Sequence, residues 1–182
     1  MVLKNKVTLL LASSLLLCAS SLLAKSEIEK AEAAHQQGQL SLAISHYQRA
    51  LDEGTSSAAS EFNLLRLYLA EQRLSDAQRL LEKLAQEQAN NVEYMQLQGD
   101  LARQLNDWEN ARNWYQQALA ANVSGVDQAV LQLKLGQALQ QSGDQTAADK
   151  AFAEYARLEG ISQMPKVTSA DANNSDNSRK EN

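Results

Sequence analysis

Hydrophobic residues recur along the central part of the chain with the three- and four-residue spacing of an α-helix. Leu135 and Leu139 are one such pair. Glycine, asparagine and aspartate interrupt the pattern at Gly38, at Asn106–Asp107 and at Gly143–Asp144, where they favour turns. The chain therefore predicts short helices joined by tight turns, with no strands.

The helical pattern repeats with a period of 34 residues. Ala43 and Ala111 are 68 residues apart, twice this period, and each is followed four positions later by a tyrosine, Tyr47 and Tyr115. A second copy lies midway between them, and a fourth begins three residues late, after extra residues in the loop 123–127. Four copies at one period predict four pairs of antiparallel helices.

Each copy places a small residue in its second helix and a large residue four positions later. The small residue lets two helices approach closely, and the large residue on the same face fills the seam with the next repeat. The small residues are Ala43, Ala77, Ala111 and Ala148, and the large ones are Tyr47, Leu81, Tyr115 and Phe152. This alternation predicts an all-α stack of helical hairpins.

The period, the paired helices and these residue types resemble the tetratricopeptide repeat over about residues 24–162. The resemblance implies a right-handed α-solenoid of four repeats. These are expected at 24–57, 58–91, 92–125 and 129–162. The chain departs from the family pattern because it lacks the repeat-ending proline, and because its first helix has Lys30 and Ala34 where larger apolar residues are usual.

Residues 1–24 are predicted to be a secretory signal peptide rather than part of the fold. Two cations, Lys4 and Lys6, precede an uncharged stretch over 7–24, and the composition turns polar directly afterwards. Cleavage after Ala24 would give an exported, periplasmic protein. The alternative is an uncleaved anchor that holds the domain in the inner membrane, facing the periplasm.

The single cysteine, Cys18, lies inside this segment. Lipoprotein processing would need a small residue before such a cysteine, and Leu17 stands there instead. Cleavage after Ser20 fits the small-residue rule better than cleavage after Ala24, but it lies within the apolar stretch. Either cleavage leaves a mature chain without disulfides or thiolate metal sites.

Composition narrows the function further. The formal net charge is −5, which argues against binding to a nucleic acid. Only seven glycines and one proline occur among 182 residues, a balance that favours helix. Residues 163–182 are rich in serine, asparagine and charge, and predict a disordered tail.

No pattern in the chain predicts catalysis. His35 and His46 are eleven residues apart, on different predicted helices. The chain has no glycine-rich phosphate loop, no histidine pair at helical spacing and no serine-centred nucleophile elbow. The sequence therefore predicts a protein that is not an enzyme, with no catalytic, cofactor-binding or metal-ligating residue.

In a solenoid of helix pairs, the first helix of each repeat lines a concave face. Register assigns to this groove Ile28, Phe62 and Gln96, then Glu32, Arg66 and Asp100, then His35, Leu69 and Arg103, and in the fourth repeat Leu133, Gln137 and Gln140. Phe62 is the predicted apolar anchor for a partner segment, with Arg66 or Arg103 contacting its carbonyl or acidic groups. The alternative for Glu32, Arg66 and Asp100 is an internal ladder of alternating charge.

Two further surfaces are expected to meet partners. Trp114 points to the convex side, where it either packs against the fourth repeat or contacts a partner. The fourth repeat has no capping helix after it, so its apolar edge is covered by residues 155–161, by a partner or by a second copy of the chain.

The resemblance implies a non-catalytic scaffold or adaptor that binds another envelope protein or a peptide segment of one. Secretion, pilus, cytochrome-maturation and cell-wall machinery all use such proteins, and no residue chooses among them. The alternatives are a self-associating structural protein, dimeric through the fourth repeat, and an accessory subunit of an envelope enzyme complex. A membrane is expected to be involved only if the N-terminal segment stays uncleaved.

Overall fold

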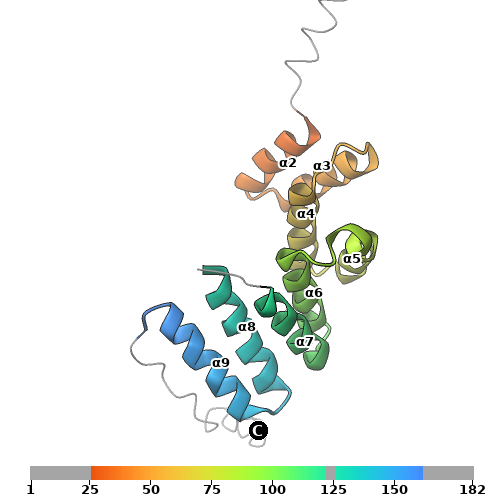
Figure 1. Ribbon diagram of the computed structural model, residues 1–182. Coiled ribbons are helices and arrows are strands. Elements are labelled where there is room, and N and C mark those ends of the chain that lie inside the picture. Colours follow the sequence, from red (N-terminus) through yellow and green to blue (C-terminus); the bar gives the residue numbers. More distant parts are fainter. Residues whose placement is uncertain (1–25, 122–125, 162–182) are drawn as a thin grey trace, which may run out of the picture. The chain divides into compact units, whose positions relative to one another are not determined.

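The computed structural model describes residues 26–121 and 126–161, and every regular element in these ranges is an α-helix (Figure 1). The helices are α2 (Glu27–Gln36), α3 (Leu40–Asp52), α4 (Ala58–Ala70), α5 (Leu74–Gln88), α6 (Val92–Gln104), α7 (Trp108–Ala120), α8 (Val126–Gln141) and α9 (Gln145–Leu158). The all-α prediction is confirmed. The predicted signal peptide, the predicted tail and most of the loop before α8 lie outside the described residues.

Polar side chains begin most of these helices by accepting hydrogen bonds from free backbone N–H groups. Ser26 caps α2 in a reciprocal capping box with Glu29, and Ser57 does the same for α4 with Ser60. The single-residue caps are Asn91 on α6, Asp107 on α7 and Asp144 on α9. The helix starts are therefore fixed locally by the sequence.

The backbone turns inside the hairpins repeat with the period of the sequence. Each first helix ends in a hydrogen bond of 2.8–3.0 Å that spans five residues, as in a Schellman motif. The donors are the backbone amides of Gln39, Arg73, Asp107 and Asp144, spaced by 34, 34 and 37 residues. The residue before each donor has a positive φ angle; these are Gly38, Gln72, Asn106 and Gly143. The predicted turns are confirmed, and the turn at Gln72 is an addition.

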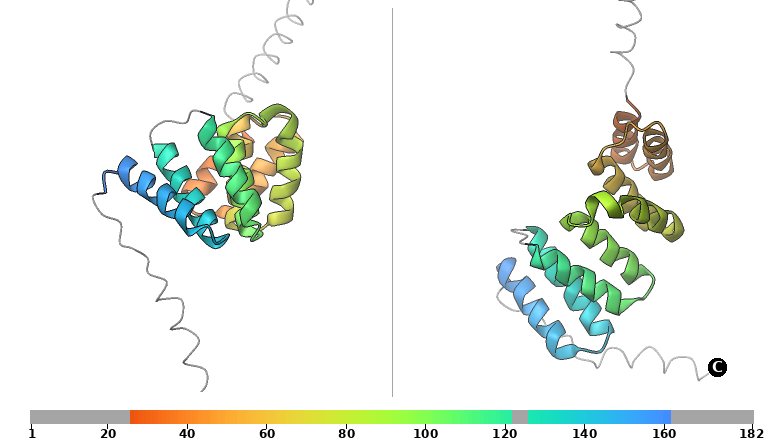
Figure 2. Two further views of the ribbon diagram at one scale, coloured as in Figure 1. Left: turned by 60° about the horizontal axis from the view of Figure 1, so that its bottom comes forward. Right: turned by 45° about the vertical axis from the view of Figure 1, so that its right-hand side comes forward.

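The contacts divide the chain into two units, residues 1–87 and 88–182. In the first unit, α2 packs along α3, and α3 also contacts α4. In the second unit, α6 packs along α7, α7 contacts α8, and α8 packs along α9 (Figure 2). The superhelix predicted over four repeats, and the repeat boundaries themselves, stay predictions.

The alternation of small and large side chains is confirmed by burial. Ala43, Ala77, Ala111 and Ala148 are each 0% exposed. Tyr47, Leu81 and Tyr115 are at most 2% exposed, whereas Phe152 in the last helix is half-buried. Since the second helix of each hairpin buries its alanine completely, the small residue marks the line of closest helix packing.

Two helical glycines extend this pattern to the first helices. A Cβ atom placed on Gly99 would lie 2.4 Å from Cε1 of Tyr115, and one on Gly136 would lie 2.5 Å from Cε1 of Phe152. Tyr115 shares a core with Leu131 of α8, as predicted for a residue that fills the seam to the next repeat. The prediction was incomplete, because each ring also lies directly over the first helix of its own hairpin.

Within the described ranges, no helix combines the length and the apolar character needed to cross a bilayer.

Candidate partner-binding surface

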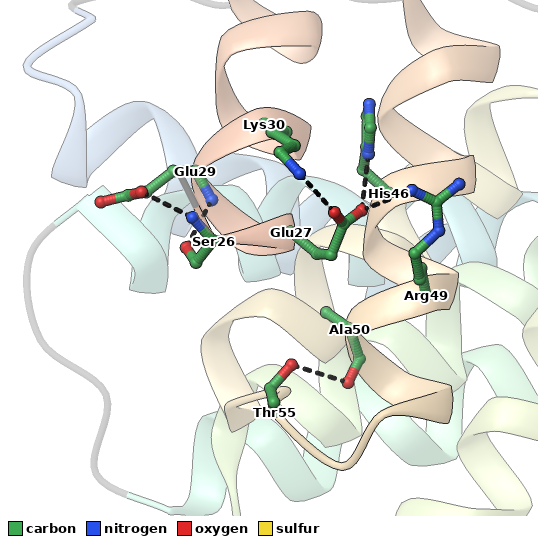
Figure 3. Close-up of polar contacts among 8 residues, drawn as sticks. All are labelled: Ser26, Glu27, Glu29, Lys30, His46, Arg49, Ala50 and Thr55. Atoms are coloured by element: carbon green, nitrogen blue, oxygen red, sulfur yellow. Dashed lines mark hydrogen bonds and ion pairs between the residues drawn. The ribbon is translucent and has the colours of Figure 1, made fainter. Parts of the chain in front are cut away.

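In the first unit, a single carboxylate joins α2 to α3 (Figure 3). Glu27 lies 2.6 Å from Nζ of Lys30, 2.8 Å from Nδ1 of His46 and 3.1 Å from Nη1 of Arg49. The hydrogen bonds from Lys30 and His46 lower the pKa of the Glu27 carboxyl to about 2. Glu27 therefore stays ionised under ordinary conditions and links the first described helix to its hairpin partner.

We expect Glu27→Gln to lower the melting temperature at pH 7, because the amide keeps the shape but loses the charge. A carboxyl whose pKa is lowered on folding stabilises the fold above its ordinary value of 4.5, and that stabilisation disappears as the pH falls through about 2. The difference in melting temperature between wild type and variant should therefore vanish at pH 2. Circular dichroism melts at both pH values measure it.

The control for this experiment is Glu53→Gln, which removes an exposed carboxylate just after α3. We expect it to leave the melting temperature unchanged at either pH. An equal deficit of the Glu27 variant at pH 7 and pH 2 would contradict an electrostatic role for Glu27.

The groove residues predicted in the first unit are only partly available to a partner. Phe62 and Leu69 are 2% and 5% exposed, so the prediction that they contact a partner is wrong: both are core residues. Ile28 is half-buried, and Arg66 is exposed, with its guanidinium donating to Oδ1 of Asn63 at 3.0 Å. The physical reason is that α4 buries apolar side chains on most of its surface; they are Phe62, Leu64, Leu65, Leu67, Tyr68 and Leu69.

In the second unit, Asp100 of α6 holds three helices together. Its Oδ1 accepts a hydrogen bond of 2.8 Å from the Tyr115 hydroxyl of α7, and its Oδ2 lies 2.6 Å from Nζ of Lys134 of α8. Asp100 is 8% exposed, and Lys134 is half-buried. Burial, followed by the charge of Asp100, raises the pKa of the Tyr115 hydroxyl. The three side chains form a structural charge-assisted network, which we call the Asp100 cluster.

The Asp100 cluster changes the predicted assignment of Asp100. Asp100 was expected to line the groove or to join a ladder of alternating charge with Glu32 and Arg66. Its carboxylate is instead committed to Tyr115 and Lys134, so the prediction that Asp100 contacts a partner is wrong. The structure contains a charged rung between first helices, but its cation lies 34 residues after Asp100. The rung from Arg66 to Asp100 would join the two units and stays a prediction.

The other predicted residues of the second unit lie around this cluster on α6 and α8. Their spacing of three, four and seven residues places them on one face of each helix. We call this surface the α6–α8 face; it comprises Gln96, Asp100, Arg103 and Gln104 of α6 and Leu133, Lys134, Gln137, Gln140 and Gln141 of α8. Gln137 and Gln141 are exposed, and the remaining glutamines, Arg103 and Leu133 are half-buried.

Two polar atoms on this face are buried without a hydrogen-bond partner. They are Nε of Arg103 and Oε1 of Gln104, which belong to consecutive residues near the end of α6. Buried polar atoms are nearly always paired, because an unpaired donor or acceptor costs about 1–3 kcal/mol. The α6–α8 face is therefore where the second unit has unmet hydrogen-bonding capacity.

Trp114 does not pack as either prediction described. Its indole makes an edge-to-face contact with Tyr94 of α6, with ring centroids 6.2 Å apart and planes at 89°. Trp114 is half-buried, whereas Tyr94 is 3% exposed. The defined aromatic contact is thus with the first helix of its own hairpin, and a partner contact at Trp114 stays a prediction.

The end of the second unit differs from the apolar edge that was expected. The exposed residues of α9 are mostly polar, and include Asp149, Lys150 and Arg157. Among the described residues near this end, Ile161 is the large apolar side chain left exposed, at 41%. Dimerisation through the fourth repeat stays a prediction, without the apolar surface that suggested it.

Among residues 26–121 and 126–161, no group of three or more histidine, cysteine, aspartate or glutamate side chains is placed to hold a metal ion. The described histidines have other surroundings: His46 contacts Glu27, and His35 is exposed on α2.

Comparisons with known proteins agree with the repeat pattern. Residues 19–141 match the tetratricopeptide repeat-like domain family. Curated protein sequences give no significant match.

Solved structures show the same fold at low sequence identity. MamA from Desulfovibrio magneticus RS-1 is 14% identical, with a TM-score of 0.65 over 76% of each chain. MamA of strain AMB-1 is 17% identical, with a TM-score of 0.63 over 74% of this chain and 78% of that one. BtubC from P. vanneervenii is 17% identical, with a TM-score of 0.62 over 78% of this chain and 66% of that one.

Proposed function

Because this chain belongs to the tetratricopeptide repeat-like domain family, we propose that it is a non-catalytic adaptor of the bacterial cell envelope. Proteins of this fold generally bind protein partners, and their stacked first helices offer an extended surface for them. We place the partner segment on the α6–α8 face. The rest of the second unit supports this surface from behind.

The observation that carries the proposal is the unmet hydrogen-bonding capacity of the α6–α8 face. Its polar side chains project from two helices that α7 and the Asp100 cluster hold in a fixed arrangement. A rigid scaffold positions a binding surface more accurately than a loop does. The buried Nε of Arg103 and Oε1 of Gln104 have no partner within the described residues, and a bound segment would supply them.

Two exposed glutamines of this face provide the test. We expect Gln137→Glu with Gln141→Glu to abolish recovery of the partner by crosslinking and co-purification from intact cells, because two added charges must be desolvated on binding. The matched control is Gln116→Glu with Gln117→Glu, at two exposed positions of α7. Equal recovery with both double variants would exclude the α6–α8 face as the binding surface.

We also propose that the protein acts after export, with residues 1–24 serving as the signal peptide. Sequencing the amino terminus of the protein from its producing cell tests this proposal. A mature chain that starts at Lys25 supports cleavage, whereas an intact segment in the membrane fraction supports the anchored form. A full-length chain in the cytosol would contradict export.

A further inference from the structure

We infer that the α6–α8 face recognises the backbone of an extended polypeptide segment through glutamine amides, with little dependence on the segment's side chains. This inference rests on the proposed function and specifies its partner chemistry. It is carried by three properties of the face: its residue type, its charge and its unpaired atoms.

Glutamine dominates the polar residues of this face. Gln96 and Gln104 project from α6, and Gln137, Gln140 and Gln141 project from α8. Each carboxamide offers an oxygen acceptor and an N–H₂ donor, which is the same pair of functions that a peptide group presents. Two first helices of glutamines therefore match the alternating C=O and N–H groups along an extended chain.

Charge on the face is largely cancelled. The carboxylate of Asp100 and the ammonium of Lys134 are 2.6 Å apart, and Asp100 also accepts from Tyr115. This pairing leaves the Arg103 guanidinium as the one additional formal charge among the residues that define the face. An acidic or a basic segment would thus find little of the complementary charge that gives specificity to charged interfaces.

The unpaired atoms are one donor and one acceptor. The Nε–H of Arg103 can donate, and Oε1 of Gln104 can only accept. A phosphate or a carboxylate would satisfy the donor alone, whereas a peptide group can satisfy both. Other glutamines find partners inside the chain: Gln98 donates to the Tyr94 hydroxyl at 2.7 Å, and Gln145 donates to Asp149 at 2.7 Å.

The test uses the protein as its producing cell processes it and a fluorescein-labelled peptide of alternating serine and alanine. About ten residues suffice, because an extended chain of that length spans roughly 33 Å. The comparison peptide carries methyl groups on alternate backbone nitrogens, which removes N–H donors and keeps the side chains. We expect methylation to weaken binding about tenfold, and a change from about 50 to 500 mM NaCl to leave the affinity unchanged.

Variants locate the effect on the protein. Gln137→Ala with Gln141→Ala should weaken binding of the unmethylated peptide about fivefold to tenfold, whereas Gln116→Ala with Gln117→Ala on α7 should leave it unchanged. In nuclear magnetic resonance spectra, the side-chain amide signals of the α6–α8 glutamines should shift with the unmethylated peptide.

Three results would overturn the inference. Equal binding of the two peptides would exclude backbone recognition, as would no binding of either peptide at millimolar concentration. Much tighter, salt-sensitive binding of a serine–glutamate peptide would show that Arg103 and Lys134 read charge. None of these results would remove the proposed function, since the crosslinking comparison of the glutamate double variants tests that separately.

Discussion

Gly99→Leu is expected to destabilise the second unit by about 3 kcal/mol, because a side chain there must displace a buried ring. Even a single Cβ atom at Gly99 would lie 2.4 Å from Cε1 of Tyr115, which is 0% exposed. Moving this ring would also break the hydrogen bond from the Tyr115 hydroxyl to Asp100. Urea unfolding followed by circular dichroism measures the loss.

The second hairpin suggests how to recover part of this stability. Leu65 and Leu81 lie 34 residues before Gly99 and Tyr115, and both are at most 1% exposed. The double variant Gly99→Leu with Tyr115→Leu copies this leucine pair, and we expect it to be more stable than Gly99→Leu alone. Gln117→Leu, on the exposed side of α7, is the control and should change stability by about 0.5 kcal/mol or less. Wild-type stability of Gly99→Leu would contradict the packing described for this glycine.

Asp100→Ala is expected to lower the free energy of unfolding by about 2–4 kcal/mol. The substitution leaves the buried Tyr115 hydroxyl without its acceptor and the half-buried ammonium of Lys134 without its counter-charge. Asp149→Ala is the control, since this aspartate is exposed on α9 and should cost much less.

A double-mutant cycle separates the two bonds of Asp100. If the ion pair contributes, Asp100→Ala together with Lys134→Met should cost less than the sum of the single variants. Additive losses would instead assign the effect of Asp100 to its bond with Tyr115. A loss below about 1 kcal/mol for Asp100→Ala would contradict the view that the cluster holds α6, α7 and α8 together.

The hairpins were predictable because their determinants are local. Turn residues such as Gly38 and Asn106 adopt positive φ angles at little cost, and the alanines that allow close packing recur at a fixed period. Gln72 was not predictable as a turn residue, since no propensity favours glutamine with positive φ. The backbone hydrogen bond from Arg73 to Tyr68 forms the same turn there without a favoured residue.

The candidate surface was harder to predict, because register gives a position but not the depth of burial. Phe62 occupies a groove position, yet α4 is apolar around most of its circumference, and its aromatic ring is buried. The partner of Asp100 was missed for a related reason. The three extra residues in the loop 123–127 shifted the numerical alignment to Gln137, whereas packing of the helices brings Lys134 to the carboxylate.

Site-specific photocrosslinking in living cells tests the α6–α8 face most directly. A photoreactive phenylalanine analogue at Gln137 should capture a partner protein, and the same analogue at Gln117 of α7 should not, although both positions are exposed. A captured partner at Gln137 alone is the predicted result. Capture at Gln117 alone, or equally at both positions, would contradict the assignment of partner binding to the first helices of the second unit.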